Sequence, residues 1–273
     1  MTAYQMVDAK VSASGGALST TAANRSTGIM EIVFIGILLS VLSAAGGSSD
    51  DRTLCPRLAA FDAAKWEEIE RAFGDAPVWK MDQAWRDKRE RRFRAGKVRI
   101  GWRDDRLLCF ADLSDRDLIT KALKRNEPIW SLGDALEVFA GVNGHPSYIE
   151  YHTAPNGVVL QLFWPDSSAL KRASEPGGLA RFTRIENGTL TKVRPVRSGY
   201  QVYMEIPASA VWGRKPPKGT LAGQVWDLSF GRYDYTSNEV AHVVSSTSPL
   251  TQTALHRRHE WRRVEFVEPI IGR

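Results

Sequence analysis

The stretch VRIGWRDDRLLCF, residues 98–110, decides the fold class of this 273-residue chain. Its first five residues alternate between apolar and polar or small side chains, which is the period of a β-strand with one buried face. The four charged residues Arg103 to Arg106 predict a turn, and the apolar run from Leu107 to Phe110 predicts a returning strand. The stretch therefore predicts a β-hairpin.

Working outward from this hairpin, strand-like runs recur along most of the chain and are separated by turn residues. Asn156-Gly157 and Asn187-Gly188 are dipeptides that favour two-residue hairpin turns. We expect further strands over residues 134–140, 148–153, 158–164, 180–186, 190–196, 199–207, 225–233 and 261–266. A short helix within residues 56–76 and a helical turn over 208–212 complete the prediction. The pattern predicts an all-β fold, an antiparallel β-sandwich of about ten strands.

The N-terminal segment reads as a leader, so we expect residues 50–273 to form a single domain after a leader of residues 1–49. An apolar run from Ile32 to Leu42 is too short to span a bilayer comfortably and suits the core of a signal peptide. Small residues at Ser43 and Ala45 match a cleavage site. An uncleaved membrane anchor and a buried helix are the alternatives. Either of the first two predicts that the domain is secreted, periplasmic or displayed on the cell surface.

Composition limits the partners that we expect. The net charge is +6, and much of the excess lies in two runs, residues 86–94 and 257–263, that acids and aromatics interrupt. No nucleic-acid-binding motif accompanies them, so we expect no nucleic acid. The runs are interpreted as solvated surface, with an acidic glycan or a membrane surface as the alternative. We expect membrane contact only through an uncleaved leader, and the oligomeric state stays open.

The two cysteines, Cys55 and Cys109, form no metal-binding pair. In an exported chain they can form one disulfide, and two unpaired thiols are the alternative. No Gly-x-Ser-x-Gly, His-Glu-x-x-His or phosphate-binding loop is present. The sequence therefore favours a non-catalytic protein.

Five segments in the same order resemble the family 9 carbohydrate-binding modules. The resemblance spans roughly residues 75–268, and each segment alone is a weak signal. Its first segment is the opening hairpin. The second is a Trp followed by Asp-x-x-Glu on a strand, Trp130 to Phe139. The others are Tyr148 to Tyr151, Gly199 to Pro207, and a closing strand preceded by a histidine, His256 to Phe266.

This resemblance implies a β-sandwich that binds a polysaccharide or oligosaccharide between aromatic side chains, with structural calcium in some members. The chain departs from the family in one place, because many relatives carry a Trp shortly before the closing histidine. Here residues 243–250 read VVSSTSPL, with no aromatic residue. The departure puts a sugar sandwiched between two indoles in doubt and leaves a scaffold that has lost its ligand as an alternative.

Exposed aromatics with flanking polar groups suit sugars, because a pyranose has one apolar C–H face and a rim of hydroxyls. Trp130 ends a polar loop beside a strand, and Glu137 matches the family's strand carboxylate. Trp164 precedes a turn and is expected at a sandwich rim. Structural roles are the alternative for each residue. The candidate ligand-binding residues are Trp130, Glu137, Tyr151, Trp164 and His256.

Calcium is the one metal that the sequence leaves open, since Asp112, Asp115 and Asp117 form an acidic loop cluster whose alternative is plain solvation. We expect no other cofactor. A glycoside hydrolase would need two strand carboxylates from among Glu137, Glu150 and Glu205. A haem protein would pair Met204 with His152 or His256. The favoured hypothesis is an exported carbohydrate-binding domain.

Overall fold

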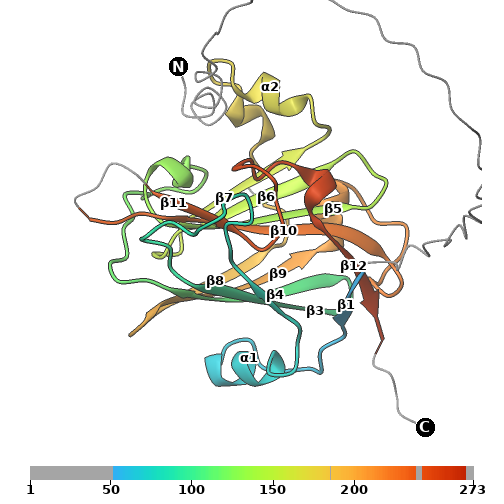
Figure 1. Ribbon diagram of the computed structural model, residues 1–273. Coiled ribbons are helices and arrows are strands. Elements are labelled where there is room, and N and C mark those ends of the chain that lie inside the picture. Colours follow the sequence, from blue (N-terminus) through green and yellow to red (C-terminus); the bar gives the residue numbers. More distant parts are fainter. Residues whose placement is uncertain (1–51, 185, 238–241, 269–273) are drawn as a thin grey trace, which may run out of the picture.

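Residues 98–110 form the hairpin that their alternation predicts. In the computed structural model, which describes residues 52–184, 186–237 and 242–268, β3 (Gly96–Arg103) pairs with β4 (Arg106–Ser114). Asp104 takes a φ of 55° at the turn, a conformation that Asp tolerates better than most residues. The predicted leader lies outside the described residues. The described part is mostly β, with two facing sheets (Figure 1).

One sheet contains seven strands. Its order is β1 (Thr53–Pro56), β12 (Arg262–Val267), β10 (Val225–Asp234), β5 (Ala135–Val142), β6 (Tyr148–Thr153) and β7 (Val159–Trp164), and β11 (Val243–Ser246) pairs with β10. All of these pairs are antiparallel except β1 with β12, which is parallel. The first and last strands of the described chain are therefore neighbours.

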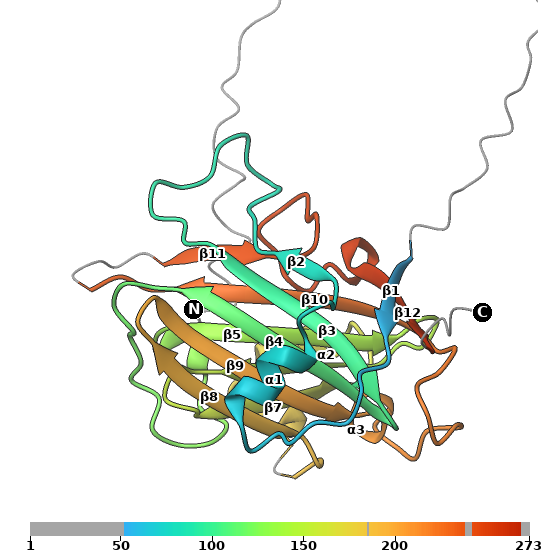
Figure 2. The same cartoon turned by 90° about the horizontal axis from the view of Figure 1, so that it is seen from below.

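The other sheet contains five strands in the order β2 (Val78–Lys80), β3, β4, β9 (Gly199–Pro207) and β8 (Leu190–Val196). Helix α1 (Trp66–Ala72) crosses its outer face (Figure 2). Phe73 follows that helix, and its ring lies 5.7 Å from Phe110 and 6.2 Å from Tyr203. This apolar contact covers part of the outer face of the five-stranded sheet.

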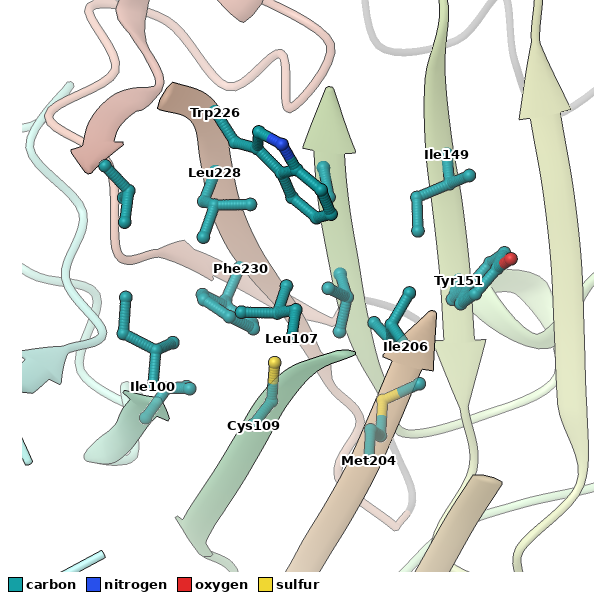
Figure 3. Close-up of a cluster of buried hydrophobic side chains, with 14 of the residues drawn as sticks. Ile100, Leu107, Cys109, Ile149, Tyr151, Met204, Ile206, Trp226, Leu228 and Phe230 are labelled. Carbon is teal, nitrogen blue, oxygen red and sulfur yellow. The ribbon is translucent and has the colours of Figure 1, made fainter. Parts of the chain in front are cut away.

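The main core lies between the two sheets, and Figure 3 shows part of it. Alternate residues of each strand point into it, including Ile149 and Tyr151 from β6 and Phe230 from β10. Cys55 and Cys109 both lie in this core as free thiols. Burial raises the pKa of both thiols, so each behaves as a small apolar side chain.

A second apolar cluster covers the outer face of the seven-stranded sheet. It lies beneath η2 (Ile129–Ser131), α2 (Ala169–Ala173), η3 (Leu179–Phe182) and the segment that contains η4 (Arg258–Glu260). Figure 1 shows α2 on this side of the sheet, opposite α1. Strands β5 and β6 are consequently buried along their whole length. Side chains on the outer face of these two strands are thus held under loops and not in open solvent.

The predicted elements and the observed ones differ at a few places. The strand predicted over residues 180–186 is wrong. η3 occupies its start, and among the described residues of this range Thr183 alone makes a sheet bridge. α2 lies between two predicted strands, in a stretch for which the sequence predicts neither a helix nor a strand. β1, β2 and β11 are too short, at three or four residues, to show a period in the sequence. The predicted helical turn at 208–212 is confirmed as α3 (Ala208–Trp212). Within the described ranges, no helix has the length and apolar character needed to cross a bilayer.

Candidate functional site

The candidate site begins with polar side chains on the outer face of β5 and β6. Glu137 and His152 are direct cross-strand partners, and Glu150 lies two residues before His152 on the same face. Residues two apart on a strand share a face, so the three side chains converge. All three are about 2% exposed or less. Burial of two carboxylates and an imidazole requires that they satisfy one another.

His152 lies between the two carboxylates. Its Nε2 is 2.8 Å from Glu150 Oε1, and its Nδ1 is 2.9 Å from Glu137 Oε1, an ion-pair distance at which the ring N–H is poorly aligned for a hydrogen bond. Burial acts to lower the pKa of His152, but the two glutamates outweigh burial and raise that pKa to about 10. The ring is an imidazolium at neutral pH. Because both ring nitrogens face carboxylates, this cluster leaves no nitrogen lone pair for a metal ion.

The other carboxylate oxygen of Glu150, Oε2, contacts two further residues. It accepts a hydrogen bond of 2.7 Å from Trp164 Nε1 and lies 3.5 Å from His256 Nε2. His256 Nδ1 is in turn 3.0 Å from the Tyr148 hydroxyl. Burial acts to raise the pKa of Glu150, but His256, His152 and Trp164 together hold it below its ordinary value. Glu150 is therefore ionised and fixed in place.

A cavity of about 570 Å³ opens above this cluster, and we call it the aromatic pocket. Its walls come from the segment between β2 and β3, from η2, β10 and α2, and from the segment before η4. Its lining includes the aromatic, carboxylate and imidazole side chains of Trp85, Trp130, Glu137, Tyr233, His242 and His256. The pocket thus combines aromatic rings with carboxylate and imidazole groups, which is the composition of a small-molecule site.

Trp130 is held by its backbone and by its ring. The Tyr235 hydroxyl donates a hydrogen bond of 2.6 Å to the Trp130 carbonyl. The indole lies 5.2 Å from the His152 ring, with a 49° angle between the two planes. An imidazolium beside an indole is a favourable cation–π arrangement. Trp130 is half-buried, so part of the ring is available at the pocket wall.

The carboxylate of Glu137 has room because its neighbour across the sheet is a glycine. Gly231 of β10 pairs with Glu137. A Cβ at Gly231 would lie 3.2 Å from Glu137 Oε2 and 2.7 Å from Leu255 Cδ1. A side chain at this position would therefore push Leu255 or the carboxylate aside. The glycine allows the segment before η4 to close over β10.

Three residues with aromatic or imidazole rings line the pocket without having been candidates from the sequence. Trp85, Tyr233 and His242 all line the aromatic pocket. Tyr233 continues the alternation of β10, so its outer-face position could have been found from the period of that strand. Trp85 lies in a charged segment without a period, and nothing in the sequence links it to Trp130. It supplies a second indole from a part of the chain other than residues 243–250.

The five candidates divide into three groups. Trp130, Glu137 and His256 come together around the aromatic pocket. Trp164 is fully buried and not at a rim, where it holds Glu150 through its indole N–H. Tyr151 belongs to the core between the sheets (Figure 3). Its alternation with His152 turns it away from the pocket, so it cannot contact a ligand there.

The acidic loop cluster does not converge on one point. Asp112 forms a 3.3 Å ion pair with Lys97, and Asp117 accepts a hydrogen bond from the Ser237 backbone N–H. Asp115 instead lies with Asp134 and Asp234, their carboxylate oxygens within 4.8 Å of one another. The residues that the sequence groups as a calcium loop are thus divided among three places.

Arg232 sits at the centre of this buried aspartate group. Its guanidinium is fully buried, 2.9 Å from Asp115 Oδ2 and 3.5 Å from Asp234 Oδ2. Burial raises the pKa of Asp134 to about 7 and that of Asp234 to about 6. The arginine already supplies a positive charge to these carboxylates, so the group does not fit a calcium ion as it stands.

Comparison with known proteins agrees with this architecture. No family model matches the sequence, and no curated protein matches it either. Among solved structures, a candidate carbohydrate-binding protein from Bacteroides uniformis superposes with a TM-score of 0.61 at 14% identity, over 79% of this chain and 98% of the other.

Two further structures are family 9 carbohydrate-binding modules from Caldicellulosiruptor kristjanssonii. One, in complex with cellotriose, has a TM-score of 0.54 at 13% identity, over 80% of this chain and 94% of the other. The other, in complex with glucose, has a TM-score of 0.52 at 13% identity, over 81% of this chain and 98% of the other. The chain therefore has the β-sandwich fold of the family 9 carbohydrate-binding modules.

Proposed function

We propose that this chain is an exported, non-catalytic domain that binds carbohydrate in the aromatic pocket. The observation that carries the proposal is the placement of two indoles, Trp85 and Trp130, around one cavity beside the fixed carboxylate of Glu137. An indole face can stack on the C–H face of a pyranose, and a carboxylate accepts hydrogen bonds from its hydroxyls. The neighbouring structures with the same fold support carbohydrate binding in general.

The indole of Trp85 compensates for the one departure from the family pattern, which is the missing Trp shortly before the closing histidine. Residues 243–250 carry no aromatic side chain, but Trp85 lines the pocket from a different segment. The pocket therefore retains two aromatic walls. This arrangement favours sugar binding over the alternative of a scaffold that has lost its ligand.

The geometry of the carboxylates favours binding over hydrolysis. Glu137 and Glu150 each lie within 3 Å of His152, so both carboxylates share the positive charge of one imidazolium. A glycosidase needs one carboxyl group that holds a proton for the leaving oxygen. The pKa of Glu150 is instead held low, by His256, His152 and Trp164 against the effect of burial. Glu150 therefore orients its neighbours and does not act as a general acid.

Export is the part of the proposal that rests on the leader alone. The apolar run from Ile32 to Leu42 and the small residues after it support export. Expression of the full chain with a C-terminal tag, followed by fractionation and N-terminal sequencing of the product, tests it. A product that begins near residue 46 and lies outside the cytoplasm is expected. A full-length cytoplasmic product would overturn export and leave the binding proposal standing.

Isothermal titration calorimetry of residues 50–273 against neutral monosaccharides and oligosaccharides tests the binding proposal. Saturable binding is expected, and Trp130→Ala should weaken it at least about thirtyfold, because an anchoring aromatic contributes about 2 kcal/mol. Trp66→Ala is the matched control, since Trp66 is a half-buried indole on α1 at the opposite sheet. A folded domain that binds no sugar would favour the scaffold function.

A further inference from the structure

A second and larger cavity lies beside the aromatic pocket. It measures about 810 Å³ and is bounded by the β5–β6 turn, the residues before α2, and η4 with the start of β12. We call it the polar pocket. Of the candidate ligand-binding residues from the sequence, His256 lines this cavity, and Trp130 and Glu137 do not. The polar pocket therefore adjoins the aromatic pocket without being part of it.

The two pockets share a wall. His256 and Leu170 line both cavities. The imidazole of His256 is held between the Tyr148 hydroxyl at 3.0 Å and Glu150 Oε2 at 3.5 Å. The side chain is therefore a fixed part of the wall that the two cavities share. A chain of linked sugars that occupies both cavities has to pass beside it.

The polar pocket has the lining that sugar hydroxyls require. His145, Ser167, His259 and Arg263 place imidazole, hydroxyl and guanidinium groups along it. Ser167 is exposed and His259 is 71% exposed by side chain. Such groups donate to and accept from hydroxyls, whereas an apolar ligand would leave them unpaired. The lining therefore matches a hydrophilic ligand.

The carboxylates of the polar pocket are already engaged by arginines. Asp227 lies 3.1 Å from Arg258, and Glu260 forms an ion pair with Arg257 at 2.5 Å. Arg258 also donates to the carbonyls of His145 and Ser147, at 2.6 and 3.0 Å. These contacts fix the floor and the turn above it. The pocket is thus a preformed cavity, which lowers the entropic cost of binding.

We infer that the polar pocket is a second subsite, which holds the next units of an oligosaccharide whose first unit occupies the aromatic pocket. The inference rests on the proposed function. It commits the ligand class to oligosaccharides of two or more units, because a single sugar fills only one of the two cavities. Affinity therefore rises with chain length past the first unit.

Calorimetry with one sugar series, from the monosaccharide to the tetrasaccharide, tests the inference. The series is chosen for a monosaccharide that binds. The trisaccharide is expected to bind at least about tenfold more tightly than the monosaccharide, which corresponds to about 1.4 kcal/mol. Equal affinities along the series would overturn the second subsite and leave the proposed function intact.

Ser167→Trp provides a blocking variant, because Ser167 is exposed at the polar pocket and an indole there occupies part of the space that a second sugar unit needs. It should bring the trisaccharide to within about threefold of the monosaccharide and leave the monosaccharide unchanged. Ser198→Trp, at the exposed β8–β9 turn of the other sheet, is the control. Undiminished trisaccharide binding in Ser167→Trp would also overturn the inference.

The double variant Arg263→Ala with His259→Ala removes polar contacts without adding bulk, and it should show the same selective loss. Trp130→Ala separates the two proposals, because it should weaken monosaccharide and trisaccharide alike. If none of the monosaccharides and oligosaccharides screened binds to the folded domain, the proposed function fails, and the subsite inference fails with it.

Discussion

His152 shows how one buried side chain can hold two others. Its imidazolium satisfies the carboxylates of Glu137 and Glu150 at 2.9 and 2.8 Å. Removal of one member of a buried charge cluster leaves the others uncompensated, which costs far more than the cluster contributes relative to apolar packing. The residue therefore shapes the aromatic pocket indirectly, by fixing the group that faces the ligand.

His152→Ala is expected to lower the free energy of unfolding at pH 7 by about 3 to 5 kcal/mol. Because the folded pKa is about 10 and the ordinary value is 6.5, this stabilisation is complete below about pH 6.5 and is lost as the pH rises through 10. Urea denaturation from pH 6 to 10 measures both effects. His259→Ala, at an exposed histidine, should change stability by less than about 0.5 kcal/mol. A wild-type stability that stays flat between pH 7 and 10 would contradict the ion pairs.

Asp234 differs from His152 because the native state disfavours its charged form. Burial raises its pKa to about 6 from an ordinary 3.8, and Asp115 adds to the rise while Arg232 opposes it. The native state therefore holds the proton more tightly than the unfolded chain, and this carboxyl makes stability fall as the pH rises from about 4 to 6. Arg232 keeps its closer ion pair with Asp115 whatever the state of Asp234.

Asp234→Asn should consequently stabilise the protein by about 1 to 3 kcal/mol at pH 7 and flatten the fall between pH 4 and 6. Thermal or urea denaturation at pH 4, 5, 6 and 7 measures the difference. Asp104→Asn is a control at an exposed carboxylate. A variant less stable than wild type at pH 7 would show that the ion pair with Arg232 outweighs burial.

Strand β6 illustrates what can be read from a single element. The hairpin at residues 98–110 was predictable because only one face of β3 is fully apolar. β6 reads YIEYHT and is buried on both faces, so its polar and apolar residues do not alternate. Tyr151 and His152 could not be assigned to faces from the sequence for that reason. Glu137 and Trp130 were found because a family pattern named them, and Trp85 was missed because its segment has no pattern.

Trp85 lies in the segment between β2 and β3 and lines the aromatic pocket. Gln83 holds this segment in place. Gln83 accepts a hydrogen bond of 2.8 Å from the Glu90 backbone N–H and donates one of 2.8 Å to the Val244 carbonyl of β11. The side chain is 2% exposed. It therefore closes the segment on itself and ties it to the sheet.

Gln83→Ala is expected to weaken sugar binding about three- to tenfold, because a loosened Trp85 must be ordered again when ligand binds. Calorimetry well below the melting temperature measures the affinity. Lys88→Ala, at an exposed lysine of the same segment, should leave it unchanged. Unaltered affinity in Gln83→Ala, with the domain folded, would mean that Trp85 is positioned by other contacts.

For the molecule as a whole, fold class was predictable and the arrangement of the loops was not. Period-two alternation and turn dipeptides suffice for an antiparallel sandwich. The cover over the seven-stranded sheet depends on segments such as residues 165–184 and 247–261, which have no period and fold against side chains far away in sequence. Both pockets lie under that cover. The site was therefore predictable only where a strand contributes to it.

The parallel pairing of β1 with β12 has a consequence for biosynthesis. Thr53 to Pro56 pair with Val264 to Val267. The first strand of the described chain therefore cannot pair until the ribosome has synthesised about 200 further residues. At translation rates of roughly 5 to 20 residues per second, that wait lasts about 10 to 40 s. A chain of this topology cannot complete its seven-stranded sheet until its last strand has left the ribosome.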